Sequence, residues 1–350
     1  MPADDRGEYR PGERRRELIQ PGRRPGKPVV SPAFPVLTGS FRGFYPADVD
    51  KATSPMVHWE KLAAYIPKRY MPRKGEDAVA ELKGKKLFLL DMDGTIYLDN
   101  DLFPGTIPFL RWVRETGGTY LFLTNNSSRS AQAYIEKLGR MGVEAAKEDF
   151  LTSVDALIAD LQAGPRRTLC YAFGTESFRS QLREAGVPVT DHLEEEIDCL
   201  LIGFDTELTF QKLEDACILL NRGVDFIATN PDWVCPTWYG SVPDCGSVCE
   251  MLYRATGRRP RVIGKPQRAM VDLALRRTGF PPEAAVVVGD RLYTDIACGV
   301  NAGVDAAFVL SGEGTLADLE TSDVQPTWVF DDIAALHRAL WEEEDHGQHR

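Results

Sequence analysis

The sequence has no apolar run that approaches the roughly 18 residues of a membrane-spanning helix. Its first residues are rich in arginine and proline and lack the apolar core of a signal peptide. We therefore expect a cytoplasmic protein with no membrane partner.

An excess of basic residues is also missing. Lys and Arg number 41 against 52 Asp and Glu, which gives a formal net charge of −11. Because an acidic chain repels nucleic acid, we expect no nucleic-acid partner. The seven cysteines form no Cys-x-x-Cys pair and are odd in number, so we expect buried free thiols rather than disulfides or a zinc site. We expect the same of Cys245 and Cys249, which are four positions apart.

The 350 residues, 43% of them hydrophobic, are enough for about two globular domains. Residues 1–83 differ from the rest, and we expect an N-terminal extension that is partly disordered. Its basic, proline-rich first thirty residues form either a solvated tail or an arm for an anionic partner. Aromatic residues between 34 and 70 predict that the later part packs on the body, with a short helix near 59–65.

From residue 84 onward, short apolar runs alternate with amphipathic segments. This alternation predicts an α/β fold with a Rossmann-like parallel sheet and helices on both faces. We expect a core domain made of residues 84–166 and 258–345, interrupted by a smaller inserted α/β cap domain at 167–257. The expected strands are 87–90, 119–123, 168–173, 199–204, 225–229, a short one near 262–263, 284–288 and 306–310. The expected helices are 106–116, one from 128 or 130 to 142, 154–161, one ending near 186, 210–221, 267–277, 295–302 and 332–341.

Residues 230–246 show no periodicity but contain tryptophan and glycine. A long segment of this kind predicts an ordered binding loop. Trp233, Trp238 and Tyr239 belong either to the cap core or to a substrate-binding surface, and the sequence leaves both alternatives open.

Polar residues follow four of the expected strands. Because side chains alternate along a strand, Asp91 and Asp93 leave the first strand on the same side. The residues at the other three strand ends are Thr124, Asn125 and Asn126, then Lys265, then Asp290 with Asp295 five residues later. If these strands are neighbours in one parallel sheet, their carboxyl ends converge on one site.

Two carboxylates about 4 Å apart repel each other by roughly 4 kcal/mol at an effective dielectric constant of about 20. Asp91 and Asp93 therefore predict either a bound divalent cation or a raised pKa. Mg²⁺ prefers oxygen ligands, which Asp91, the carbonyl of Asp93 and Asp290 supply.

These residue types suit phosphoryl transfer. Asp91 can attack phosphorus, while Lys265 and the Thr124 hydroxyl hold the phosphate oxygens. Asn125 and Asn126 offer further neutral donors. Asp93 can protonate the leaving alkoxide and later deprotonate the water that cleaves the aspartyl-phosphate.

Four segments carry a resemblance to the haloacid dehalogenase superfamily. They are Asp-Met-Asp-Gly-Thr at 91–95, Thr-Asn-Asn at 124–126, Gly-Lys-Pro at 264–266, and Gly-Asp-Arg-Leu-Tyr-Thr-Asp at 289–295. The Asn-Pro-Asp segment at 230–232 and the insert around it resemble the subfamily of 4-nitrophenylphosphatase-like and NagD-like phosphatases. The resemblance covers residues 84–340.

The resemblance implies Asp91 as nucleophile and Asp93 as acid and base. It implies Asp290 as a magnesium ligand, with Asp295 and Thr294 supporting the ligands from behind. It also implies that the insert closes over the site and selects the leaving group.

The sequence thus predicts a magnesium-dependent phosphatase that hydrolyses a small phosphomonoester, a sugar phosphate or nucleotide monophosphate, through an aspartyl-phosphate. Phosphoryl transfer to an acceptor other than water, or a phospho-aspartate signalling module, are the alternatives. Self-association through the cap also stays open. Individual residues keep simpler alternatives: a helix cap for Thr124 and Asp295, and a surface position for Lys265.

Overall fold

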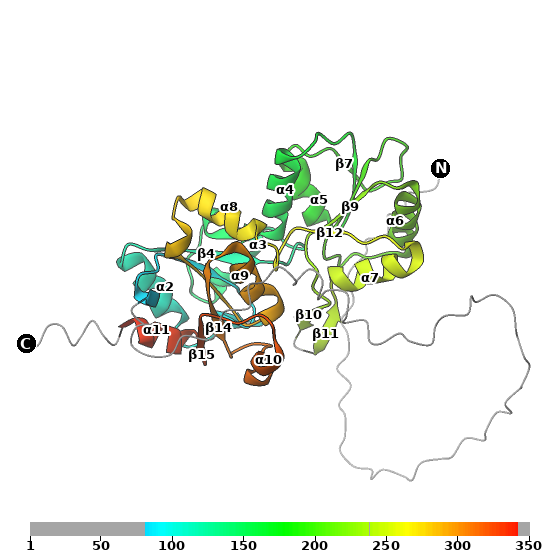
Figure 1. Cartoon of the computed structure of the whole chain (residues 1–350). Coiled ribbons are helices and arrows are strands. Elements are labelled where there is room, and N and C mark those ends of the chain that lie inside the picture. Colours follow the sequence, from blue (N-terminus) through cyan, green and yellow to red (C-terminus); the bar gives the residue numbers. More distant parts are fainter. Residues whose placement is uncertain (1–80, 238, 342–350) are drawn as a thin grey trace, which may run out of the picture. The chain divides into compact units, whose positions relative to one another are not determined.

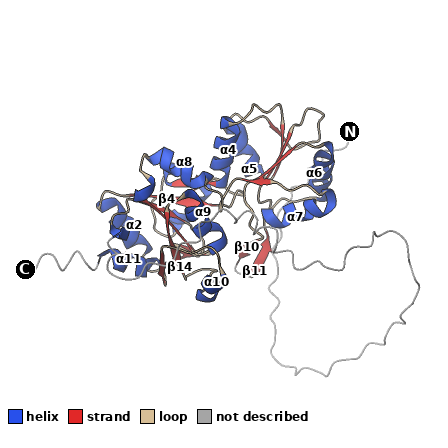
Figure 2. Cartoon of the chain, in the orientation of Figure 1, coloured by secondary structure: helices blue, strands red, loops and turns tan. Residues whose placement is uncertain are grey.

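The computed structural model describes residues 81–237 and 239–341. Its largest sheet has six strands in the order β15-β14-β13-β1-β4-β5, and each neighbouring pair is parallel. Strands β4 and β14 of this sheet are labelled in Figures 1 and 2. The strands are β1 (Leu87–Leu90), β4 (Thr119–Thr124), β5 (Phe150–Thr152), β13 (Ala285–Gly289), β14 (Asp305–Val309) and β15 (Trp328–Phe330). The chain runs from β1 to one side of the sheet and later returns to the other side through β13, so the order reverses between β1 and β13.

Helices cover both faces of this sheet because successive residues of β1 point to opposite faces. Phe88 and Leu90 belong to one hydrophobic cluster, with α2 (Thr106–Glu115), α3 (Ala131–Arg140) and α11 (Ile333–Trp341). Leu87 and Leu89 belong to the other. Its helices are α4 (Ser153–Ala163), α8 (Ala269–Thr278) and α9 (Ala297–Ala302). The predicted sheet with helices on both faces is therefore confirmed.

A second parallel sheet has five strands in the order β12-β9-β8-β6-β7, four of them from the insert and β12 from just beyond it. The strands are β6 (Cys170–Phe173), β7 (Val189–Thr190), β8 (Cys199–Ile202), β9 (Asp225–Ala228) and β12 (Arg261–Val262). The helices between them are α5 (Glu176–Glu184), α6 (Phe210–Arg222) and α7 (Cys245–Thr256).

Smaller elements complete the described chain. Two antiparallel hairpins are formed by β2 (Tyr97–Leu98) with β3 (Asp101–Leu102), and by β10 (Val234–Thr237) with β11 (Gly240–Pro243). Other helical segments are α10 (Leu316–Thr321), the 3-10 turns Lys147–Asp149 and Pro282–Ala284, and a π-helical turn at Leu292–Ile296.

Two expectations are wrong. The short strand before Lys265, β12, pairs with β9 of the five-stranded sheet and not with the strands that carry Asp91 and Asp290. Residues 234–243 form a hairpin rather than an irregular loop. The exact domain limits, 84–166, 167–257 and 258–345, stay predictions.

Some predicted features lie outside the described residues: most of the 1–83 extension, its helix near 59–65, Trp238 and the tail 342–350. All seven cysteines lie inside them as free thiols, five of them buried, as expected. None of the helices in the described ranges has the length and apolarity that a membrane span requires.

Candidate active site

Asp91 and Asp290 lie side by side at the point where the strand order of the six-stranded sheet reverses. Register pairs Leu90 of β1 with Val288 of β13, and the Asp91 N–H donates to the Val288 carbonyl at 2.8 Å. A carboxylate oxygen from each of Asp91, Asp290 and Asp295 lies within 4.8 Å of the other two. In open α/β sheets the crevice at such a reversal is where ligands bind.

The turn after β1 depends on Gly94. Its φ of 85° is left-handed, a conformation that other residues avoid. A Cβ at this position would stand 2.5 Å from Asp290 Oδ2. The Ser311 hydroxyl fixes the turn from outside by donating to the Gly94 carbonyl at 2.7 Å.

Asp290 is buried, and only one of its two carboxylate oxygens accepts a hydrogen bond within the described residues. Its Oδ2 accepts from the Glu313 N–H at 2.7 Å, whereas Oδ1 is buried without a hydrogen-bond partner among the described residues. Burial, followed by the charge of Asp295, raises the pKa of Asp290 to about 6. Burial raises the pKa of Asp91 as well, with further contributions from Asp295 and Asp290. A buried oxygen without a partner, beside other carboxylates, fits a hard divalent cation such as Mg²⁺.

Asp295 lies in the π-helical turn, and both of its oxygens are used inside the protein. Oδ1 accepts from Lys265 Nζ at 2.6 Å and Oδ2 accepts from the Arg291 N–H at 3.1 Å. The neighbouring Thr294 is buried in the same turn. Asp295 is therefore placed to hold Lys265 beside the carboxylates.

Lys265 is only 2% exposed, so the alternative of a surface lysine is wrong. Its ammonium group donates to Asp91 Oδ1, to Asp295 Oδ1 and, at 3.2 Å, to the carbonyl of Leu123. Burial alone would lower the pKa of Lys265, but the charges of Asp295 and Asp91 outweigh burial and raise it. The lysine is therefore a fixed positive charge beside Asp91.

The carboxylate of Asp93 lies beside the β2–β3 hairpin. Tyr97 donates a 3.1 Å hydrogen bond to its Oδ2, and Lys137 Nζ lies 3.8 Å from its Oδ1. Desolvation by surrounding atoms raises the pKa of Asp93, and Lys137 and Tyr97 oppose that effect. Sequence reasoning missed both partners. Only the spacing of four residues between Asp93 and Tyr97 was available as a signal.

The residues after β4 divide into two roles. Thr124 Oγ1 accepts from the Asn126 N–H at 3.1 Å, and Asn126 Oδ1 accepts from the Ser128 hydroxyl at 2.7 Å, so these side chains shape the loop. Asn125 instead uses both amide hydrogens inside the protein, at 2.9 Å each to Asp232 Oδ2 and to the Lys265 carbonyl. The Asn125 amide therefore has no free hydrogen for a phosphate in this arrangement.

Of the aromatic residues predicted to lie either in the cap core or on a substrate-binding surface, Trp233 is 42% and Tyr239 64% exposed, so neither belongs to a cap core. Trp233 directly precedes β10, and Tyr239 lies in the turn between β10 and β11. Another contact that the sequence did not predict joins Arg291, which follows Asp290, to Asp232 across 3.8 Å.

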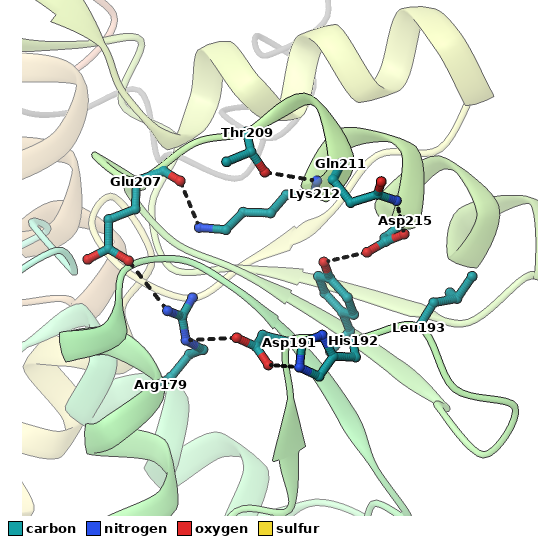
Figure 3. Close-up of a pocket in the computed structure, with 10 residues that line it drawn as sticks. Arg179, Asp191, His192, Leu193, Glu207, Thr209, Gln211, Lys212 and Asp215 are labelled. Atoms are coloured by element: carbon teal, nitrogen blue, oxygen red, sulfur yellow. Dashed lines mark hydrogen bonds and ion pairs between the residues drawn. The ribbon is translucent and has the colours of Figure 1, made fainter. Parts of the chain in front are cut away.

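A separate cavity of about 550 Å³ lies beside the five-stranded sheet (Figure 3). None of the predicted site residues lines it. Its two cations are already paired: Lys212 Nζ lies 2.7 Å from Asp205 Oδ2, and Arg179 Nε lies 2.9 Å from Glu176 Oε2. The cavity therefore offers no free cation to a phosphate.

Comparisons with known proteins agree with the geometry. A family model described as haloacid dehalogenase-like hydrolase matches residues 88–188, and a second model of the same kind of hydrolase matches 262–336. The chain is 34% identical over 252 residues to an acid sugar phosphatase of Staphylococcus haemolyticus. That match covers 72% of this chain and 95% of the relative.

Two solved structures that this chain resembles are also phosphatases. A 4-nitrophenylphosphatase from Thermotoga maritima is 39% identical with a TM-score of 0.71, over 74% of this chain and 99% of that one. A glycerol phosphate phosphatase from Mycobacterium tuberculosis, in complex with magnesium, is 31% identical with a TM-score of 0.68. That match covers 73% of this chain and 77% of that one.

Proposed function

Since the chain belongs to the family of haloacid dehalogenase-like hydrolases, and its relatives there are phosphatases, we propose that it hydrolyses a small phosphomonoester through an aspartyl-phosphate on Asp91. The observation that carries this proposal is the meeting of Asp91, Asp290 and Lys265 at the reversal point of the sheet. Asp91 and Asp290 come from neighbouring parallel strands, and Lys265 provides the positive charge that a phosphate needs.

In the first step, a carboxylate oxygen of Asp91 attacks phosphorus and the bond from phosphorus to the alcohol oxygen breaks. Asp93 gives its proton to the departing alkoxide. Lys265 and the Thr124 hydroxyl bind the phosphate oxygens, on which negative charge develops. Asn126 contributes by shaping the loop that presents Thr124.

In the second step, Asp93 takes a proton from water, and the water oxygen attacks the phosphorus of the aspartyl-phosphate. Inorganic phosphate leaves and Asp91 is restored. Asp91, Asp290 and the carbonyl of Asp93 would hold a Mg²⁺ ion, whose positive charge would offset the repulsion between the carboxylates and the phosphate. Asp295 and Thr294 support this arrangement from the π-helical turn.

The relatives favour a phosphorylated sugar or polyol as substrate. One is named an acid sugar phosphatase and another a glycerol phosphate phosphatase. Nucleotide monophosphates remain the alternative class, to be compared in the same assay.

The proposal is tested with the purified chain and Mg²⁺ on a panel of sugar phosphates, glycerol phosphates and nucleotide monophosphates, by measuring released phosphate. We expect turnover that is highest for sugar or polyol phosphates and absent in Asp91→Asn. A uniformly flat response, or near-normal turnover of Asp91→Asn, contradicts the proposal. Adding free sugar acceptors distinguishes hydrolysis from transfer, because transfer lowers phosphate release and forms a new ester.

A further inference from the structure

The lysine that binds Asp91 is carried by the sheet of the insert. Strand β12 pairs with β9, with Val262 beside Ala228. The pairing continues beyond the strand, because the Gly264 N–H donates to the Thr229 carbonyl at 2.7 Å. Lys265 is the next residue. Its backbone is therefore attached to the five-stranded sheet, while its ammonium group lies against Asp91 of the six-stranded sheet.

Asn125 holds the backbone of Lys265 through two hydrogen bonds. Its Oδ1 accepts from the Lys265 N–H and its Nδ2 donates to the Lys265 carbonyl, both at 2.9 Å. Because one bond involves the N–H of Lys265 and the other its carbonyl, together they fix both the position and the orientation of this residue. The packing between Asn125 and this segment is tight, because a Cβ on Gly264 would stand 2.6 Å from Asn125 Oδ1.

Asp232 in turn fixes Asn125. Its Oδ2 accepts from Asn125 Nδ2 and from Asn230 Nδ2, both at 2.9 Å. Asn230 also donates to Asp244 Oδ1 at 3.1 Å, at the start of α7. These side chains are all buried, so water does not replace their bonds easily. A continuous polar chain thus runs from α7 through Asp232 and Asn125 to Lys265.

We propose that Asp232 and Asn125 are positioning residues that fix Lys265 against Asp91, so that the insert determines where the phosphate-binding lysine stands. This inference rests on the proposed function, in which Lys265 binds the phosphate. Asp232 needs no contact with substrate in this role. It acts through Asn125, and its loss displaces the ammonium group by releasing the backbone that carries it.

The test compares Asp232→Ala with Asp232→Asn. Asparagine keeps an oxygen that can accept from Asn125 and Asn230, whereas alanine removes it. We expect Asp232→Ala to lower kcat/KM for 4-nitrophenyl phosphate by about 100-fold, the effect of an ångström-scale misplacement, and Asp232→Asn to restore most of it. Asn125→Ala should match Asp232→Ala, and the double variant should lose little more than either, because both act on one clamp.

Asp215→Ala is the matched control. Asp215 is another buried carboxylate of the insert that accepts two side-chain hydrogen bonds, from Tyr171 at 2.9 Å and Gln211 at 3.0 Å (Figure 3). It should lower the melting temperature and leave kcat/KM unchanged. If Asp232→Ala behaves like Asp215→Ala in kcat/KM, the positioning role is overturned. If Asp232→Ala does not fold, Asn125→Ala takes its place in this comparison, because it breaks the same chain of hydrogen bonds to Lys265.

Binding of inorganic phosphate, measured by calorimetry, separates this inference from the proposed function. We expect Asp232→Ala to weaken phosphate binding about tenfold and Asp215→Ala to leave it unchanged. A wild-type chain that binds phosphate without hydrolysing any ester contradicts the proposed function alone. Equal phosphate affinity in wild type and Asp232→Ala contradicts the positioning role alone.

Discussion

Gly94 lies directly against Asp290: a Cβ on residue 94 would stand 2.5 Å from Asp290 Oδ2. Gly94→Ala should therefore move the Asp290 carboxylate and also strain a left-handed backbone. Gly117→Ala is the control, because its φ of 75° is equally left-handed but nothing lies within 4 Å of the added Cβ. Both should lose about 1 to 2 kcal/mol of unfolding free energy to the strained backbone, and only Gly94→Ala should lose phosphatase activity. Equal activities would show that residue 94 does not control Asp290.

Asp93→Asn should separate the two steps of the reaction. With 4-nitrophenyl phosphate the leaving group needs little protonation, so the first step survives and the second slows by roughly 10²- to 10⁴-fold. Rapid mixing should show a burst of about one nitrophenolate per enzyme, followed by slow turnover. Alkyl phosphates should show no burst, because their alkoxide needs the proton of Asp93. The absence of a burst, or unchanged steady-state rates, would remove the acid and base role.

Magnesium should stabilise the chain through Asp290. At pH 7.5, wild type should melt at a higher temperature with Mg²⁺ than with a chelator, since a cation that binds only the folded state adds about 2.7 kcal/mol at 100 times its Kd. Asp290→Asn should abolish this increase and be at least as stable as wild type without metal, because it removes a buried charge with an unpaired oxygen. Asp215→Asn, another buried carboxylate, should keep the increase. A full magnesium response in Asp290→Asn would exclude Asp290 as a ligand.

Asp244 should make stability depend on pH. Burial and then the charge of Asp232 raise the pKa of Asp244 to about 7, although the Cys245 N–H, Asn230 and Arg291 oppose the shift. Between the ordinary aspartate pKa, about 4, and about pH 7 the folded chain holds a proton that the unfolded chain has released. Stability therefore falls as pH rises through this window, by up to about 4 kcal/mol.

Asp244→Asn keeps an N-cap oxygen at the start of α7 but does not titrate. Its unfolding free energy, measured with urea between pH 4 and pH 8, should depend less on pH and exceed that of wild type at pH 8. Parallel curves for the two proteins would mean that Asp244 does not hold the proton.

Much of the fold could be predicted because its central strands are continuous apolar runs. β1, β4 and β13 lie within a residue or two of the expected positions, and each ends in the polar residues that form the site. Alternating strands and helices then require a parallel sheet whose carboxyl ends meet. Asp91 and Asp290, almost 200 residues apart, could be brought together by this argument alone.

The pairing of short strands, and the contacts between distant side chains, could not be predicted in the same way. β12 has only two residues, and its apolar pattern does not distinguish an edge strand of one sheet from an edge strand of another. The hairpin at 234–243 contains Pro236 and Pro243 and has no alternation to mark it. The bond between Asn125 and Asp232 spans 107 positions, and neither residue carries a local signal for the other.

The attachment of Lys265 to the edge of the second sheet affects how caps can be exchanged between relatives. A transplant limited to residues 167–257 would pair β9 with the recipient's own strand in place of β12 and would keep the recipient's lysine on a strand shaped for a different neighbour. A transplant that continues through residue 266 moves β12, Asp232 and Lys265 together. The segment to exchange therefore extends as far as Lys265, whose ammonium group donates to Asp91.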